Sequence, residues 1–346
     1  MEAPKKKSKA KRIILTLVGV FLGLYVVGGT AAGIVVPKIL FSTQGKKIDA
    51  LQTLPFRIYK TREDYPNMAT REVYSFSSDG NRLQGYLYGK ENTAYTVLHA
   101  HGMNLFSDAK EAAIASYYLD HQCRVFMVDL TGSGNSEGNG LGSLSQSVHD
   151  VKAAYQFLKN EGLLQGKLVL SGYSWGAHGV SKAFADGIPA DKLIAFSGYD
   201  SAYEEMVAMA GRRSANISYL TLPTFALGLR ISQGEEAFEK ASDKLKEKAE
   251  KCFFIQGKTD GTVPYSISLA HAMEGSKASF YLTEDSHVTP WFSPQARAYF
   301  REQVEPNLDK VTKEEEEQFL AKVDKEAMCE LDQTLFDRIL EFLQRP

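Results

Sequence analysis

The sequence has few cysteines and no segment of unusual composition. The three cysteines, at positions 123, 252 and 329, are odd in number and show neither a disulfide framework nor the spacing of metal ligands. The chain of 346 residues contains no Pro-rich or Gly/Ser-rich tract and no internal repeat. With 44% hydrophobic and 24% charged residues, its composition is globular and excludes disordered, collagen-like and disulfide-rich proteins.

The chain also lacks the excess of positive charge that nucleic-acid binding requires. Its 40 basic residues nearly balance its 42 acidic residues, but positions 1–12 hold six of the basic residues and only one acidic residue. The rest of the chain therefore has 34 basic and 41 acidic residues, a net charge of −7. Because affinity for nucleic acid depends on Lys and Arg that neutralise phosphates, nucleic acid is excluded as a partner.

One long uncharged run stands near the amino terminus, at residues 13–36. As a helix it would rise about 36 Å, enough to cross a hydrocarbon core of about 30 Å. The basic segment 1–12 directly precedes it, so the positive-inside rule puts the amino terminus in the cytoplasm and the remainder outside. We therefore expect a basic tail, a membrane-spanning helix that serves as a signal anchor, and a single-pass protein of the cell membrane.

Two alternatives to the membrane anchor remain open. The small residues at positions 29–32 would suit a signal peptidase, although the apolar cores of signal peptides usually run only about 7–15 residues. A buried core helix is the other alternative, but 24 uncharged residues behind a basic cluster are more than such a helix needs.

The remainder of the chain divides into an expected linker at 37–69 and a predicted α/β domain at 70–346. Alternating runs on both sides of residues 78–81 predict a hairpin. Short apolar runs then alternate with helical patterns, which predicts a mostly parallel sheet covered by helices. The expected strands lie within 96–102, 124–130, 167–174, 192–200, 252–260 and 278–287.

Two segments depart from this alternation. Residues 201–249 contain apolar and charged helix-like pieces between two expected strands, which indicates an inserted helical cap. The charged stretch 301–328 is interpreted as a solvated helix face, and an amphipathic closing helix is expected at 331–344.

The motif G-x-S-x-G occurs at residues 172–176, after an apolar strand and before a helix-compatible run. In this context a tight strand-to-helix turn exposes the serine, here Ser174, as a nucleophile. A serine hydroxyl needs an imidazole to accept its proton, and a carboxylate to orient that imidazole. The sequence must therefore supply a histidine and an acid.

His287 and Asp260 are the preferred partners of Ser174. Each follows an expected strand, and doubly wound sheets place functional groups at the carboxyl ends of their strands. His271 also follows Asp260, but it lies within a helical pattern and is interpreted as a surface or packing residue. Asp200, at the end of the preceding strand, remains the alternative acid, and the Asp-Gly at 260–261 could instead be a plain turn.

Acyl transfer also needs N–H donors for the developing oxyanion. The backbone amides of Trp175, which follows the nucleophile, and Met103, in the loop after an earlier strand, fit the required places. His99 and His101 are interpreted as structural. The sequence contains neither a P-loop nor G-x-G-x-x-G, so we expect no cofactor, and no metal.

These residues resemble the alpha/beta-hydrolase fold superfamily, specifically its membrane-anchored bacterial serine hydrolases. The likeness covers about residues 70–345 and rests on five segments. The resemblance implies nucleophile Ser174, acid Asp260 and base His287, and the serine argues against the dehalogenases of this fold. The matching segments are His101 to Asn104, Asp129 to Gly138, Gly172 to Gly176, Gly257 to Pro264, and His287.

The resulting expectation is a membrane-anchored serine esterase or lipase-like enzyme that acts on a small acyl or ester substrate through an acyl-enzyme. Apolar cap residues suggest apolar acyl groups; they are Met206, Met209, Tyr219, Phe225 and Leu227. A peptidase or acyltransferase with the same triad is one alternative, because fold and triad do not specify the substrate. A non-catalytic binding or scaffold protein on a hydrolase fold is the other.

Overall fold

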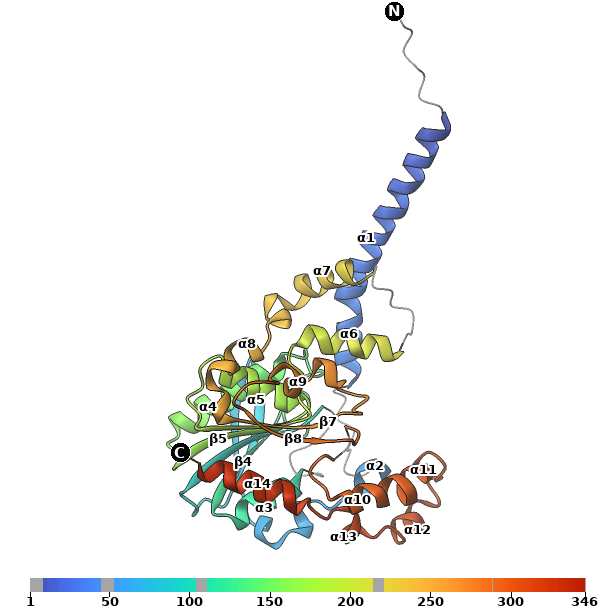
Figure 1. Ribbon diagram of the computed structural model, residues 1–346. Coiled ribbons are helices and arrows are strands. Elements are labelled where there is room, and N and C mark those ends of the chain that lie inside the picture. The colour runs from blue at the N-terminus through green and yellow to red at the C-terminus, as the bar shows by residue number, and fades with distance from the viewer. Residues whose placement is uncertain (1–8, 45–52, 104–110, 214–220, 288, 346) are drawn as a thin grey trace, which may run out of the picture.

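The computed structural model describes residues 9–44, 53–103, 111–213, 221–287 and 289–345. An eight-stranded sheet forms its centre, in the order β1-β2-β4-β3-β5-β6-β7-β8 (Figure 1). The pairs β1–β2 and β2–β4 are antiparallel, and all other neighbours are parallel. The strands are Glu72–Ser78, Asn81–Tyr88, Tyr95–Ala100, Cys123–Asp129, Lys167–Tyr173, Lys192–Phe196, Cys252–Gly257 and Ser279–Thr283.

The central strands and the edge strand of this sheet differ in how far their residues are buried. β4 is buried at every position, as expected for a strand that is covered on both faces, whereas β1 alternates between more and less exposed residues along most of its length. The turn between β1 and β2 consists of Asp79 and Gly80, both with positive φ (46° and 80°). This conformation suits the two-residue loops of hairpins, and the predicted hairpin is present.

Helices cover the two faces of the sheet and make two hydrophobic clusters. α4 (Gln146–Asn160) and α5 (Trp175–Ala185) contribute to the cluster that contains Leu98 and Phe126 of the sheet. α3 (Ala112–Asp120) and α14 (Gln333–Gln344) contribute to the cluster on Val97 and Val125. The expected alpha/beta-hydrolase fold, with a mostly parallel sheet between helices, is confirmed.

The segment between β6 and β7 is helical, as expected for a cap, and begins at the carboxyl end of β6. It contains α6 (Ala202–Arg213), α7 (Leu222–Gln233), η4 (Glu235–Phe238), α8 (Ser242–Leu245) and η5 (Lys246–Lys251). Figure 1 shows α6 and α7 on the side of the body from which the long first helix emerges.

That first helix, α1 (Lys9–Gln44), is longer than the predicted 13–36 and continues through Pro37. Its segment Lys11–Ser42 is long and apolar enough to cross a membrane. Within the described part of the expected linker, from residue 53, lie α2 (Leu54–Arg57) and two short 3₁₀ segments, η2 (Arg62–Asp64) and η3 (Pro66–Met68). Leu54, Ile58 and Met68 are buried in the body.

The charged stretch 301–328 forms short helices that lie against this amino-terminal part of the body. Arg57 donates to Glu317 over 2.7 Å, and Lys60 pairs with Glu326. These acidic side chains are largely exposed, as expected for a solvated face, so each pair contributes little to stability. The short helices after β7 are η6 (Tyr265–Ile267), α9 (Leu269–Ala272), α10 (Pro294–Tyr299), η7 (Phe300–Val304), α11 (Glu305–Leu308), α12 (Glu316–Leu320) and α13 (Lys325–Met328).

Candidate active site

Ser174 occupies the sharp turn between β5 and α5. Its backbone has φ 53° and ψ −112°, a conformation that is costly for a residue with a side chain. Both flanking glycines are required by close packing. A Cβ on Gly172 would lie 2.6 Å from the carbonyl oxygen of Gly176, and a Cβ on Gly176 would lie 2.0 Å from the carbonyl oxygen of Ala100. The local sequence therefore permits a turn that holds the serine in a strained position.

His287 lies between Ser174 and Asp260. Its Nε2 is 2.9 Å from Ser174 Oγ, and its Nδ1 is 2.7 Å from Asp260 Oδ2. All three residues are buried, with exposed fractions of 8% or less. They follow β5, β7 and β8, whose carboxyl ends meet at one edge of the sheet. The structure thus brings together the three residues that the motif and the chain order predicted.

The carboxylate of Asp260 is held from several directions. Its Oδ1 accepts hydrogen bonds from the amides of Thr262 and Val263, both over 2.8 Å. Its Oδ2 accepts a hydrogen bond from Gln256 Nε2 over 3.0 Å, in addition to its contact with His287. Gln256 was missed by the sequence analysis, although a single amide in the buried strand CFFIQG is a signal that a polar partner lies nearby.

Tyr173, the variable residue before Ser174 in the motif, holds the loop that carries the histidine. Its hydroxyl donates to the backbone carbonyl of His287 over 2.9 Å, and its ring packs in a T-shaped arrangement with Trp291, with 4.9 Å between the ring centroids. Burial raises the pKa of Tyr173 well above its ordinary value, so the hydroxyl keeps its proton and remains a donor. The sequence analysis assigned no role to this side chain.

Asp200 and His271, the alternatives to Asp260 and His287, have other partners. Asp200 is buried and accepts hydrogen bonds from the amide and hydroxyl of Ser242, over 2.8 and 2.7 Å, which ties β6 to the cap. Burial raises the pKa of this carboxyl. His271 has a side chain that is 47% exposed and contacts Glu274. The hydrogen bond from His287 Nδ1 goes to Asp260 instead.

The residues proposed as oxyanion donors come from two neighbouring segments. Trp175 is the first residue of α5, where amides lack partners within the helix, and Met103 lies in the turn after β3. The close contact of Gly176 with the carbonyls of Ala100 and His101 holds that turn beside the start of α5. The two segments that carry these residues are therefore neighbours.

His101 and His99 hold this turn in place, consistent with the structural roles expected of them. His101 Nε2 accepts a hydrogen bond from the Leu130 amide over 3.1 Å, so the proton is on Nδ1, which donates to the Gly102 carbonyl over 2.7 Å. His99 Nε2 lies 2.7 Å from Glu111, whose other oxygen accepts from the Gly102 amide over 3.1 Å. Glu111 is fully buried and was not singled out in the sequence.

The cap residues expected to favour apolar acyl groups have different surroundings. Met206 and Phe225 are buried, whereas Met209 is half-buried. Leu227 is 45% exposed. Tyr219 lies outside the described residues.

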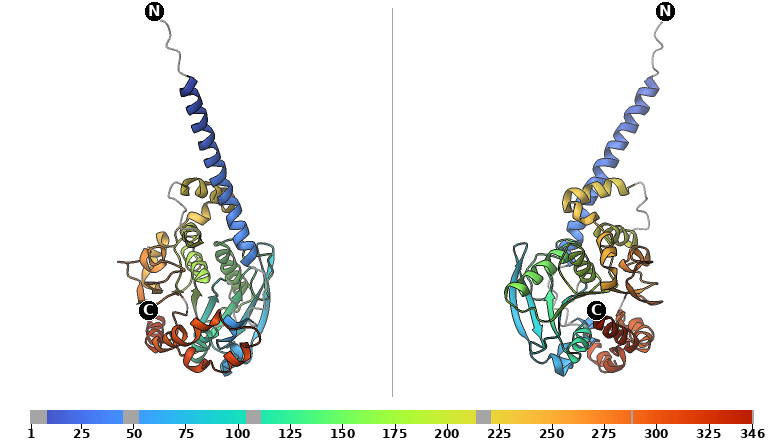
Figure 2. Two further views of the ribbon diagram at one scale, coloured as in Figure 1. Left: turned by 90° about the vertical axis from the view of Figure 1, so that its right-hand side faces the viewer. Right: turned by 60° about the vertical axis from the view of Figure 1, so that its left-hand side comes forward.

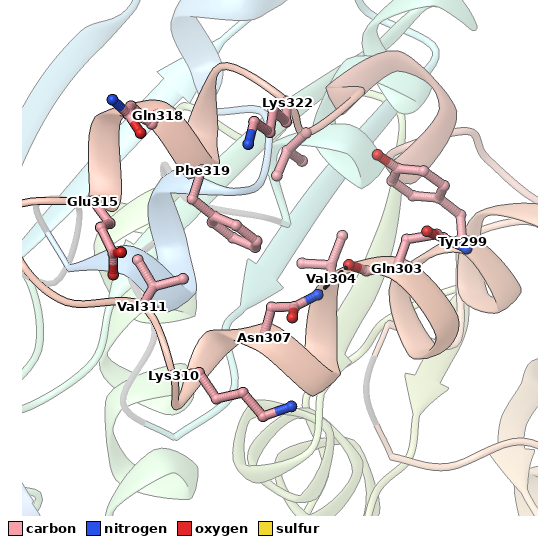
Figure 3. A pocket seen from close by; sticks show the side chains of 11 residues that line it. Tyr299, Gln303, Val304, Asn307, Lys310, Val311, Glu315, Gln318, Phe319 and Lys322 are labelled. Carbon is pink, nitrogen blue, oxygen red and sulfur yellow. Dashed lines mark hydrogen bonds between the residues drawn. The ribbon is translucent and has the colours of Figure 1, made fainter.

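A separate cavity of about 730 Å³ lies among the C-terminal helices. Figure 3 shows Phe319, Lys322 and Tyr299 among the side chains that line it. Its lining extends from residue 299 to residue 323, outside the loops that carry Ser174, Asp260 and His287. Within the part of the chain that the structure describes, no group of three or more His, Cys, Asp or Glu side chains is arranged to hold a metal ion.

Comparisons with known proteins extend the evidence from the fold. A hydrolase family model described as serine aminopeptidase, S33, matches residues 91–251, a span that includes Ser174 but ends before Asp260 and His287. Among curated proteins, the comparison finds no match to this chain.

Solved structures with a similar fold include the esterase Pf2001 of Pyrococcus furiosus. It is 17% identical with a TM-score of 0.52, and the match covers 76% of this chain and 94% of that one. A second crystal form of the same esterase is 16% identical with a TM-score of 0.51, covering 76% and 96%. Est1E of Butyrivibrio proteoclasticus is 16% identical with a TM-score of 0.47, covering 62% and 90%. The chain therefore has the alpha/beta-hydrolase fold, and its residues 91–251 match the hydrolase family model.

Proposed function

We propose that this protein is a membrane-anchored serine hydrolase that cleaves carboxylic esters or related acyl substrates. The observation that carries the proposal is the position of the His287 imidazole, 2.9 Å from Ser174 Oγ and 2.7 Å from Asp260 Oδ2. An imidazole in this position can accept the serine proton while the carboxylate stabilises the imidazolium that forms. The strained backbone of Ser174 is also typical of a nucleophile elbow.

The proposed reaction has two steps. Ser174 Oγ bonds to the acyl carbon as its proton passes to His287 Nε2, and the backbone amides of Met103 and Trp175 stabilise the oxyanion. The ester C–O bond then breaks, and the leaving alcohol takes the proton from His287. Water next attacks the acyl-enzyme and gives a proton to His287, which returns it to Ser174 as the carboxylic acid leaves.

The membrane anchor is the second part of the proposal. The Lys11–Ser42 segment of α1 is long and apolar enough to cross a bilayer. Its amino-terminal part is exposed, unlike the core helix of a soluble domain. With the basic residues 1–12 on the cytoplasmic side, the catalytic domain is extracytoplasmic.

A peptidase is the second candidate, favoured by the description of the matching family model as serine aminopeptidase. An acyltransferase would use the same triad with an alcohol or amine in place of water. Apolar residues of the cap, such as Met206, support an apolar acyl substrate in each case. Because the triad is common to these reactions, the substrate must be distinguished by measurement.

A series of p-nitrophenyl esters from acetate to palmitate tests the proposal. We expect the full-length protein in detergent to hydrolyse these esters with an optimum of chain length, and the Ser174→Ala variant to lose at least about 10⁴-fold in kcat. A fluorophosphonate should label the wild-type protein and not this variant. If the protein is labelled but hydrolyses no ester, and instead cleaves aminoacyl p-nitroanilides, the peptidase replaces the esterase proposal. Absence of labelling would favour the non-catalytic scaffold.

A further inference from the structure

The first helix is seated firmly on the catalytic body. Leu40 and Phe41, near its carboxyl end, are buried, and the Phe41 carbonyl accepts a hydrogen bond from the Leu141 amide over 3.0 Å. A Cβ on Gly140 would lie only 2.1 Å from the same carbonyl oxygen. Residues 140 and 141 belong to the loop after β4, at the carboxyl edge of the sheet. The end of α1 is therefore fixed at the edge that also carries Ser174.

α1 makes a second close contact, with the cap helix α7. A Cβ on Gly33 would lie 2.1 Å from the Phe225 carbonyl oxygen, and a Cβ on Gly228 would lie 2.0 Å from the Thr30 carbonyl oxygen. The backbones of the two helices thus touch, and Figures 1 and 2 show α7 crossing α1 where α1 leaves the body. Two separate contacts fix the direction of α1 relative to the body.

The position of this crossing along α1 determines its depth in a membrane. Twenty residues counted from Ile13 end at Ala32, and as a helix they rise about 30 Å, the thickness of a hydrocarbon core. The Ile, Leu, Val and Phe side chains from Ile13 to Val27 are 45% to 71% exposed, consistent with lipid contact. Gly33, which meets α7, then lies at the outer boundary of that core. α7 must lie at the same level.

The outward face of α7 is mostly apolar. Pro223, Leu227 and Ile231 are exposed at intervals of four residues, which places them on one side of the helix, and Leu227 and Ile231 are 45% and 63% exposed. Arg230, the one charged residue of α7, follows Leu227 by three residues, so it is exposed on the same side, where it pairs with Glu235 over 2.5 Å. An apolar stripe on a helix that lies at the membrane boundary matches the pattern of interfacial helices.

We propose that α7 lies in the interfacial layer of the bilayer and that the catalytic edge of the sheet faces the membrane. The α1 contacts, the loop after β4, the cap after β6 and the triad all belong to this one edge. The inference rests on the proposed membrane-anchored hydrolase and deepens it. Its substrate is an ester that partitions into the bilayer, and the substrate reaches Ser174 beneath the cap from the lipid side.

The depth of α7 can be measured with a fluorescent label on the full-length protein in phosphatidylcholine vesicles. An environment-sensitive fluorophore is attached to Leu227→Cys, to Leu22→Cys in the predicted span, and to Lys313→Cys on the exposed charged stretch. The three native cysteines are buried, and the unsubstituted protein checks that brief labelling leaves them unmodified. We expect lipids with a nitroxide near the headgroup to quench the Leu227 label, and we expect this label to be shielded from iodide. The Lys313 label should show the opposite behaviour in both measurements.

Two outcomes of this experiment would overturn the inference, and they differ. If the Leu22 label lies in the bilayer while the Leu227 label is as accessible to iodide as the Lys313 label, the anchor stands and the interfacial position of α7 is wrong. If the Leu22 label also remains in water, the membrane anchor itself is wrong and the inference falls with it. Ester hydrolysis by the same samples tests the catalytic proposal independently of both.

Delivery of the substrate from the bilayer can be tested separately. Leu227→Asp combined with Ile231→Asp adds two negative charges to the apolar stripe, and Lys313→Asp makes the same change of charge on a distant exposed position. We expect the double variant to lower the ratio of palmitate-ester hydrolysis in vesicles to acetate-ester hydrolysis in solution by about ten-fold or more. Lys313→Asp should keep the wild-type ratio. An unchanged ratio in the double variant would contradict delivery of the substrate from the bilayer.

Discussion

At the scale of single residues, Asp260 and Asp200 have the same side chain and different partners. Asp260 accepts from the amides of Thr262 and Val263 and from His287, whereas Asp200 accepts from Ser242 at the start of α8. Both carboxylates are buried at the end of a parallel strand. The contacts, and not the position in the strand, decide which of them can serve the histidine.

Isosteric substitutions at these two positions make a matched test. Asp260→Asn places an amide beside His287 Nδ1, which favours the wrong tautomer of the imidazole, and we expect kcat for p-nitrophenyl butyrate to fall by about 10⁴-fold. Asp200→Asn should change kcat only a few-fold and act mainly on stability, because its partner is Ser242. Thermal unfolding of both variants controls for misfolding. A greater loss of kcat in Asp200→Asn than in Asp260→Asn would refute the assignment of the acid.

The juxtaposition of Ser174, His287 and Asp260 was predictable because each follows a strand, and the carboxyl ends of parallel strands meet at one edge. The side chains that hold these three residues in place were not predictable. Gln256 is four residues from Asp260, but Tyr173 reaches the carbonyl of a residue 114 positions away. A buried polar residue in a strand signals that it needs a partner, and the partner is known only when the chain has folded.

At the scale of elements, His149 of α4 connects the hairpin to the cap. Its Nε2 lies 2.9 Å from Glu236 in η4, and its Nδ1 lies 2.5 Å from Asp79 in the β1–β2 turn. The hydrogen bond to Glu236, and then the one to Asp79, raise the pKa of His149 from 6.5 to about 9. The protonated imidazole therefore holds three segments that are distant in sequence.

A pKa that is raised in the folded state gives stability a definite dependence on pH. The contribution of His149 is complete below about pH 6.5 and is lost as pH rises through about 9, because only the folded chain holds the proton in that interval. We expect the wild-type protein to unfold at a higher temperature than His149→Gln at pH 6, and this difference to shrink toward zero by pH 10. Thermal unfolding in detergent at pH 6, 8 and 10 measures it. A difference that is constant with pH would mean that the imidazole acts by packing alone.

The secondary structure was predictable where periodicity is strong and less so where burial depends on distant segments. The run KLVLSGYS marked β5, and the amphipathic closing segment marked α14, whose apolar residues are buried at helical spacing. The expected linker contains Leu54 and Ile58, which are buried in the same cluster as residues from α14. No local pattern distinguishes such a docked segment from a solvated one.

At the scale of the whole molecule, the long first helix and the α/β body form one unit. α1 ends against the loop after β4 and crosses α7 through contacts between glycine backbones, so the first helix, the cap and the edge of the sheet that carries Ser174 are joined. The sequence indicated an anchor and a cap separately. Their contact was not predictable, because it joins Gly33 to Gly228 across 195 positions of the chain.

Two glycine substitutions test this union of anchor and cap. Gly228→Leu adds a side chain whose Cβ would lie 2.0 Å from the Thr30 carbonyl oxygen, whereas nothing lies within 4 Å of the same atom at Gly211 in the neighbouring helix α6. Overpacking of a close contact costs about 1–3 kcal/mol, so α1 and α7 must separate in Gly228→Leu. We expect trypsin to cleave after the exposed Arg230 several-fold faster in that variant, and at the wild-type rate in Gly211→Leu. Equal rates in the two variants would show that the glycine crossing does not hold the cap to the anchor.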